Sequence, residues 1–336
     1  MGVMEQNGKS NKMKIIYIKL VICSCIMFLS CTQETKKKQD VKKNIVKAPI
    51  FNEDSAYFFV EKQVSFGPRV ISSKAWLNCA NWLEKKLSNY GETKIQEAPV
   101  VTYDNKEHIL KNIIVSFSPE KNNRIALFAH WDSRHVADHD TINQFKPILG
   151  ANDGGSGVGV LIEIARQLNI KKPKIGVDIV LFDAEDYGQP ENSKFPIMED
   201  SWCLGSQYWS KQVQQSNYYA KYGILLDMVG GKNAKFTHEA TSYYFAKDIL
   251  KKVWSKAHSL GYGDFFVYQN TKQIIDDHYY VNTIAGIRTI DIIEYDPSTK
   301  TNFNKHWHTH GDNMNNIDKK TLKAVGQTLL EIIYNE

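Results

Sequence analysis

The sequence is poor in cysteine, and its few cysteines are unevenly placed. Of the five in 336 residues, Cys23, Cys25 and Cys31 lie within the first 31 positions, which leaves Cys79 and Cys203 for the rest of the chain. No CxxC pair is present, so the spacing indicates no disulfide framework. The last two cysteines could pair in an oxidising compartment, but we expect free thiols packed inside the fold.

The sequence also lacks the usual signs of a repeat protein, a nucleic-acid-binding protein or a phosphate-binding loop. No internal repeat is visible. The net charge is +5, but lysines within the first fifty residues supply much of the excess, and the near balance elsewhere implies no nucleic-acid partner. The glycine-rich stretch Gly150–Gly157 lacks the lysine and the spacing of a Walker motif, so we do not expect a phosphate-binding loop.

The N-terminus has the pattern of an export signal. Lys12, Lys14 and Lys19 precede an apolar run at Leu20–Leu29. A basic segment followed by roughly ten apolar residues is typical of a secretory signal. The run is too short for a membrane-spanning helix, which needs about twenty apolar residues.

The end of this segment resembles a bacterial lipoprotein signal, with Cys31 as the lipidated first residue of the mature chain. Residues 1–31 would then be the signal peptide, and residues 32–50 a tether too polar to pack. We expect an exported protein on the periplasmic side or the cell surface, held at a membrane by its lipid. Cys25 is a weaker lipidation candidate, secretion without a lipid stays open, and Met13 is an alternative start.

One stretch of the body combines a buried strand with an acidic end. Ile179–Phe182 is a short apolar run, and Asp183, Glu185 and Asp186 follow it. An apolar run of this kind is typical of a strand that is buried on both faces of a parallel sheet. Because unpaired buried charge is very unfavourable, we expect the acids to begin where the strand leaves the sheet. Ligands bind at that edge in open α/β sheets.

Two further apolar strands end in the same way. Arg124–Asp132 ends in His130 and Asp132, and Gly223–Asp227 ends in a carboxylate. Asp153 opens the helix that follows the first of these strands. Because parallel strands deliver their carboxyl ends to one edge of a sheet, we expect these side chains to meet there.

Strands alternate with helices along the chain, which predicts an α/β fold. We expect a single globular domain at residues 51–336, with a central, mostly parallel twisted sheet, helices on both faces and an antiparallel edge. The expected antiparallel strands are 94–101 and 109–117, with a further strand at 289–295; helices are expected at 73–90, 158–168, 242–259 and 319–334, and residues 276–278 in a loop.

The clustered acids and histidines indicate a metal site. Carboxylates that share one edge repel each other unless a cation holds them. Oxygen and imidazole ligands suit zinc, and a catalytic zinc keeps three protein ligands and an open position. From the residues alone, the expected ligands are Asp153, Asp186 and one histidine of the 306–310 loop.

These motifs follow one another in an order that resembles the zinc-dependent fold of the M28 aminopeptidases and the animal-type glutaminyl cyclases. The finer details resemble the bacterial glutaminyl cyclases. The motifs are His130–Asp132, Gly150–Gly157, Phe182–Asp186, Leu225–Asp227 and Trp307–Thr309, with Trp202–Ser206 and Asp276–His278 as the finer details.

The resemblance implies a role for individual residues. Asp153, Asp186 and His308 match the zinc ligands, with one zinc per chain, and Glu185 matches the acid that transfers protons. The animal enzymes have two consecutive glutamates where this chain has Glu185 and Asp186. They also have a disulfide partner at the position of Ala129, so that bridge is absent here.

The same resemblance assigns the surroundings of the metal. Asp227 and Asp276 match a hydrogen-bonded carboxylate network beside the proton-transferring acid. Trp307 matches a pocket-lining tryptophan, and Trp202 is expected to form a second wall.

The implied activity is the cyclisation of N-terminal glutaminyl residues of peptides and proteins to pyroglutamate, with release of ammonia. The alternative is a two-zinc aminopeptidase, in which Asp153 would bridge two metals and His130 and Asp227 would bind the second. A third possibility is a surface lipoprotein that keeps the fold without catalysis, and the intact set of ligands argues against it. The sequence does not specify an oligomeric state.

Overall fold

The computed structural model describes residues 46–336. The predicted signal peptide, the lipidation site Cys31 and most of the predicted tether lie outside the described residues. Among residues 46–336, no helix combines the length and apolar character needed to span a bilayer.

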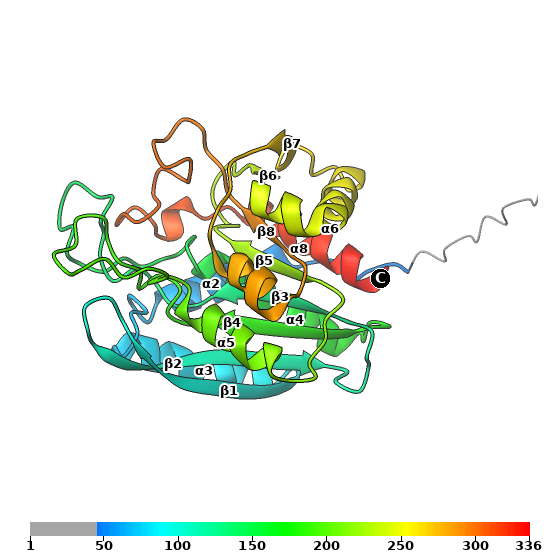
Figure 1. Cartoon of the computed structure of the whole chain (residues 1–336). Helices are drawn as coiled ribbons and strands as arrows, with labels where there is room; N and C mark the ends of the chain where they lie inside the picture. The colour runs from blue at the N-terminus through cyan, green and yellow to red at the C-terminus, as the bar shows by residue number, and fades with distance from the viewer. Residues whose placement is uncertain (1–45) are drawn as a thin grey trace, which may run out of the picture. The chain divides into compact units, whose positions relative to one another are not determined.

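A six-stranded sheet forms the centre of the described domain (Figure 1). Its strand order is β1-β2-β4-β3-β5-β8. Strands β4, β3, β5 and β8 run parallel, whereas β1 and β2 form an antiparallel edge. The strands are β1 (Glu92–Val101), β2 (Glu107–Phe117), β3 (Arg124–His130), β4 (Gly176–Phe182), β5 (Gly223–Asp227) and β8 (Thr289–Ile293). The predicted mostly parallel α/β sheet with an antiparallel edge is confirmed.

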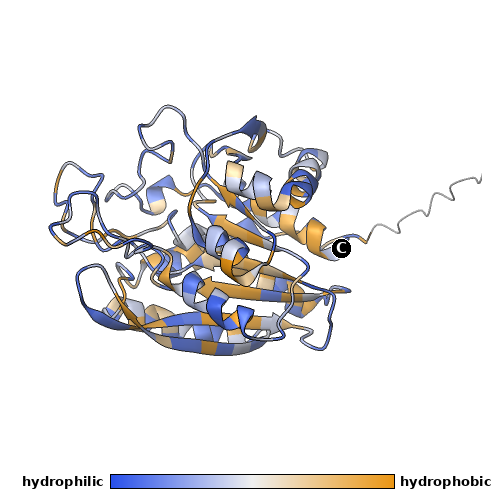
Figure 2. Ribbon diagram, viewed as in Figure 1, coloured by the Kyte–Doolittle hydropathy of each residue, from blue (hydrophilic) through white to orange (hydrophobic). Residues whose placement is uncertain are grey.

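Helices cover both faces of the sheet, as predicted. One face packs against helices α2 (Glu53–Val64), α3 (Lys74–Ser88), α4 (Gly155–Ile170), α6 (Ala240–Ser259) and α8 (Lys319–Tyr334), and the other against α5 (Leu204–Gln214) and the π-helical turn Val281–Ala285. Successive strand residues point to opposite faces, so Phe128 and Phe182 join the smaller core with Trp209, whereas Leu127 and Leu181 join the larger one. Figure 2 shows the resulting apolar centre in the middle strands.

Strand β4 carries one charge that the apolar pattern did not lead us to expect. Asp178 lies inside the strand and is buried. The guanidinium of Arg124 pairs with it through two contacts of 2.6 Å, and Ser116 and Tyr218 donate hydrogen bonds to the same carboxylate. A buried charge is tolerated here because it is fully paired.

Several predicted boundaries were wrong. Residues 276–278 are not in a loop, because Asp276 caps the short helix α7 (Asp277–Tyr280). The strand predicted at 289–295 ends at Ile293. Helix α2 and the small parallel sheet of β6 (Phe236–His238) and β7 (Phe266–Asn270) were not predicted. Cys79 and Cys203 are free and buried, so the expected packed thiols are confirmed.

Candidate active site

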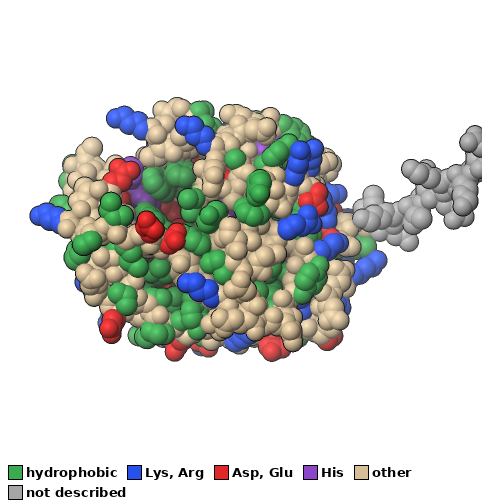
Figure 3. Space-filling view, viewed as in Figure 1, with side chains coloured by type: hydrophobic (Ala, Val, Ile, Leu, Met, Phe, Trp, Pro, Cys, Tyr) green, Lys and Arg blue, Asp and Glu red, His purple; other side chains and the backbone are tan. Residues whose placement is uncertain are grey.

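One cavity at the carboxyl ends of the parallel strands collects most of the predicted site residues. Its volume is about 600 Å³. Figure 3 shows a hollow where histidine and acidic side chains lie beside hydrophobic ones. The cavity is lined by all eight residues predicted as catalytic, metal-binding or substrate-binding: Asp153, Glu185, Asp186, Trp202, Asp227, Asp276, Trp307 and His308.

Asp153, Asp186 and His308 form a compact group on the floor of this cavity. One ligand atom from each lies within 4.8 Å of the others, and all three residues are buried. His308 Nε2 lies 3.2 Å from Asp186 Oδ1 and 3.8 Å from Asp153 Oδ2. Asp153 Oδ2 and both carboxylate oxygens of Asp186 have no hydrogen-bond partner. Buried acceptors without partners are unfavourable, so these residues fit a divalent cation with nitrogen and oxygen ligands.

Two further carboxylates hold the backbone beneath this group. Asp312 accepts hydrogen bonds from the backbone N–H groups of Asn152 and Asp153, at 2.7 and 3.0 Å. Asp132 accepts hydrogen bonds from those of Glu185 and Asp186, at 3.2 and 3.1 Å. These contacts fix the turn before α4, which carries Asp153, and the turn after β4, which carries Asp186.

His308 is oriented by a carboxylate and a guanidinium. Its Nδ1 lies 3.1 Å from Asp138 Oδ1, an ion-pair contact without hydrogen-bond geometry, and its Nε2 faces the cluster. Arg134 binds both oxygens of Asp138, at 3.2 and 2.6 Å, and donates from Nη1 to the backbone oxygen of Asp186. A metal-binding histidine commonly has its second nitrogen engaged by a carboxylate in this way.

Glu185 lies directly beside the cluster and faces the same cavity. Burial raises the pKa of its carboxyl well above the ordinary range, His130 opposes the shift, and Asp186 and Asp276 add to it. The pKa of Asp153 is raised to about 7 by burial and by the charge of Asp186. A bound cation would offset this repulsion among acids. Asp183 lies behind these residues and accepts hydrogen bonds from Trp76 Nε1 and Lys111 N.

A second group of possible ligands adjoins the first. His130 Nε2 lies 3.0 Å from Asp153 Oδ1 and 3.2 Å from Asp227 Oδ1, and ligand atoms of the three lie within 4.8 Å of one another. Asp276 lines the cavity next to them. Burial and the neighbouring Asp227 raise the pKa of Asp276 to about 6.

Aromatic rings form the walls around His308. The Trp307 ring stacks on it with 3.7 Å between centroids and 22° between planes. The Trp202 ring is nearly parallel to it, at 5.8 Å and 7°. Arg134 lies 4.3 Å from the centroid of the Trp202 ring, a cation–π contact that holds this ring in place. Both predicted wall tryptophans therefore line the cavity.

The structure also adds residues to which the sequence assigned no role. Arg134, Asp138 and Asp312 support the cluster, yet in the sequence they appear only as polar loop residues. Of the three histidines in the 306–310 loop, only His308 joins the cluster; His310 pairs instead with Asp140, at 2.8 Å. The signal that could have marked Asp138 is its place in the histidine- and aspartate-rich loop after β3.

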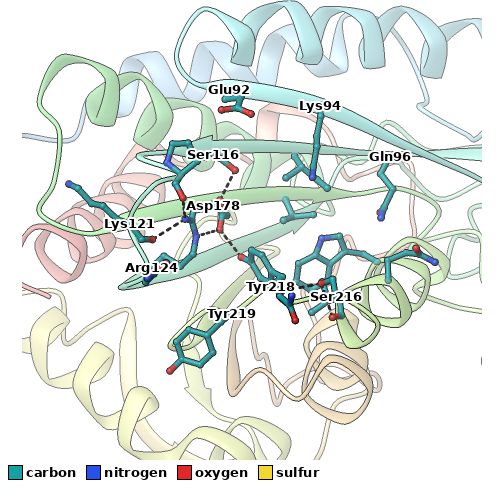
Figure 4. Close-up of a pocket in the computed structure, with 18 residues that line it drawn as sticks. Glu92, Lys94, Gln96, Ser116, Lys121, Arg124, Asp178, Ser216, Tyr218 and Tyr219 are labelled. Atoms are coloured by element: carbon teal, nitrogen blue, oxygen red, sulfur yellow. Dashed lines mark hydrogen bonds and ion pairs between the residues drawn. The ribbon is translucent and has the colours of Figure 1, made fainter.

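A larger cavity, of about 810 Å³, lies near the amino ends of the strands (Figure 4). Its most buried charges, Arg124 and Asp178, are paired with each other, and Tyr218 donates a 2.7 Å hydrogen bond to Asp178 (Figure 4). Arg124 Nη1 also donates to the backbone oxygens of Pro119 and Lys121. These groups are already satisfied, so we place the active site in the smaller cavity.

A parallel sheet with a carboxylate–histidine cluster at its carboxyl edge defines the class of protein. The sequence model of peptidase family M28 matches residues 112–333, and the chain belongs to this family. The prediction of the family is confirmed.

Several solved structures resemble this chain over nearly its whole described length. The chain is 51% identical to the glutaminyl cyclase of Tannerella forsythia, with a TM-score of 0.84, over 86% of this chain and 100% of that one. Identity, coverage and TM-score are the same for the Bacteroides thetaiotaomicron glutaminyl cyclase bound to N-acetylhistamine. A Zn-dependent exopeptidase from Parabacteroides distasonis is 52% identical, with a TM-score of 0.84, over 86% of this chain and 100% of that one.

Proposed function

We propose that this protein converts N-terminal glutaminyl residues of peptides and proteins to pyroglutamyl residues and releases ammonia. One observation carries the proposal: Glu185 and the Asp153–Asp186–His308 cluster face a single cavity whose walls are tryptophans. The whole-chain similarity to two bacterial glutaminyl cyclases supports the same activity.

Asp153, Asp186 and His308 would hold one zinc ion. The fit rests on three buried carboxylate oxygens without partners and on an imidazole nitrogen 3.2 Å from one of them. When bound, zinc supplies Lewis acidity that polarises the side-chain amide carbonyl of the substrate. Asp138 and Arg134 would keep His308 in the orientation that presents Nε2 to the metal.

Glu185 would act as the proton-transferring group. It takes a proton from the substrate's α-amine as that nitrogen attacks the amide carbon, and gives the proton to the side-chain amide nitrogen, which leaves as ammonia. The attack is intramolecular, so the enzyme gains by holding the chain in a folded, reactive conformation. Asp227 and Asp276 line the cavity next to Glu185 and would share its hydrogen-bonded network.

The aromatic walls would bind the small glutaminyl side chain and exclude water. Trp202 and Trp307 lie on the cavity surface beside His308. Since cyclisation consumes no water, a dry pocket favours ring closure over hydrolysis.

The alternative is a two-zinc aminopeptidase, favoured by the second group of possible ligands, His130, Asp153 and Asp227. The purified protein, loaded with zinc, should be offered a Gln-peptide and a leucine amide in parallel. The cyclase predicts ammonia from the first substrate, no free leucine from the second, and one tightly bound zinc per chain. Two tight zinc ions together with released leucine would overturn the cyclase assignment.

We also propose that the protein is exported and anchored by a lipid on Cys31. The support is the sequence pattern of residues 1–31. Cells expressing the full chain should incorporate labelled fatty acid into it, and Cys31→Ser should abolish the label. A matched Cys25→Ser variant should keep the label; if the label depends on Cys25 instead, the assigned anchor position is wrong.

A further inference from the structure

The residue at the start of helix α5 has an unfavourable combination of properties. Cys203 is the N-cap of this helix, yet its side chain makes no capping hydrogen bond. Its backbone is left-handed, with φ of 56° and ψ of 34°. Serine, threonine, aspartate or asparagine would cap the helix better, and glycine or asparagine would adopt the backbone more readily. Strain of this kind gathers at functional sites when surrounding contacts enforce it.

The backbone hydrogen bonds that enforce it go to the turn after β4, which carries Glu185. The N–H of Cys203 donates to the backbone oxygen of Glu185 at 3.0 Å, and that of Leu204 to the backbone oxygen of Ala184 at 3.1 Å. Ala184 is itself left-handed, with φ of 52°. The turn after β4 and the start of α5 are therefore clamped together at this point, and the left-handed backbone allows it.

The same geometry brings the thiol to the Glu185 carboxylate. Cys203 Sγ lies 3.3 Å from Glu185 Oε1, within hydrogen-bond distance for sulfur. The other polar neighbour, His130 Nδ1, lies farther away, 3.8 Å from Oε2. Among residues 46–336, the Cys203 thiol is the side chain that donates a hydrogen bond to this carboxylate. Cys203 is fully buried and has no access to solvent.

We propose that Cys203 is a positioning residue for Glu185. Its thiol donates a hydrogen bond to Oε1 and holds the carboxylate in the rotamer that faces the substrate amine. The thiol does not touch the substrate and forms no covalent bond. This inference rests on the proposed function, because it needs Glu185 to be the group that transfers the proton.

Three variants of Cys203 test the proposal, with zinc-loaded enzyme and a Gln-peptide. Cys203→Ala removes the donor and keeps the rest of the side chain. Cys203→Gly also removes the donor, and it tolerates the left-handed backbone if the alanine variant does not fold. Cys203→Ser restores a donor. Cys79→Ala is the matched control, because Cys79 is also free and buried, but its thiol donates no hydrogen bond to a site residue among residues 46–336.

A weak hydrogen bond that orients the reacting group should appear in kcat. We expect the alanine and glycine variants to lose about fivefold in kcat, with KM within about twofold of the wild type. The serine variant should recover most of this loss, and Cys79→Ala should leave kcat unchanged. Bound zinc, measured separately, should stay at the wild-type level in all variants.

Two results would overturn the proposal: unchanged kcat in both the alanine and glycine variants, or a serine variant as impaired as alanine. A wild type that releases no ammonia from the Gln-peptide is a different outcome, since it refutes the cyclase assignment. The same variants would then be compared on leucine amide, where Glu185 would activate water. A loss of kcat there, rescued by serine, would still support the positioning role.

Discussion

Replacing Asp138 by asparagine tests whether the support of His308 matters for the metal. Asp138 Oδ1 lies 3.1 Å from His308 Nδ1, and Arg134 binds both oxygens of the same carboxylate. Asparagine has nearly the same size but no charge, so it weakens the pairing with both partners. The His308 ring then loses the group that fixes its orientation and raises its basicity as a ligand.

Loss of such a supporting carboxylate typically lowers metal affinity by about 10- to 100-fold. This corresponds to about 1.4–2.8 kcal/mol of binding free energy. Asp153 and Asp186 remain in place, so we expect weaker binding rather than no binding. Competition with a chromogenic chelator, at fixed pH and ionic strength, measures the zinc dissociation constant.

Asp140 supplies a matched control on the same loop. It pairs with His310 at 2.8 Å, and this histidine does not belong to the cluster. Asp140→Asn should therefore bind zinc as the wild type does. Equal zinc affinity for Asp138→Asn and the wild type would refute the reasoning that the Asp138–His308 pair supports the metal site.

Three further changes have defined outcomes. Glu185→Gln should lower kcat by about 10²–10⁴-fold with zinc content unchanged, and full activity would show that the proton passes through another group. Burial raises the pKa of Glu294 from 4.5 to about 7. The stability that this carboxyl contributes is therefore fully present below about pH 4.5, where it is protonated in the folded and unfolded states, and is lost as pH rises through 7. Glu294→Gln should remove about 3 kcal/mol of this pH dependence from the free energy of unfolding measured by urea titration. Arg124→Met leaves the buried Asp178 carboxylate without its counter-charge, which should lower the free energy of unfolding by about 3–5 kcal/mol in urea titrations. Adding Asp178→Leu should recover most of that loss, and an Arg124→Met variant as stable as the wild type would contradict this reasoning.

The architecture was predictable because buried strands and helices have a recognisable pattern of apolar residues in the sequence. Strands β3 and β4 are buried over all seven of their residues, and each appears in the sequence as a mainly apolar run. Helix α8 begins and ends where its pattern predicted, at Lys319 and Tyr334. Helix α2 was missed because its apolar periodicity is weak, although Asn52 caps it. The small β6–β7 sheet was missed because its strands are short and, in β7, largely exposed.

The sequence by itself determined which residues reach the active site. Acids that directly follow buried strands must lie at one edge of a parallel sheet, because the strand direction leaves them no other place. This argument brought Asp186 and Asp227 together. Asp153 was added because it opens the helix after β3, and the resemblance to a known family selected His308 from its loop. The structure brings all of them to one cavity.

Only the tertiary structure decided what surrounds those residues. Asp138 contacts His308 from 170 positions earlier in the chain, and Cys203, at the start of helix α5, reaches Glu185 in the turn after β4. Contacts of this kind depend on loop paths and on backbone strain, such as the left-handed turns at Ala184 and Cys203. Neither leaves a periodic pattern, because each depends on a single pair of residues placed by the packing of separate elements. The sequence therefore predicted which acids and which histidine share one cavity, whereas the fold specified the contacts that hold them in place.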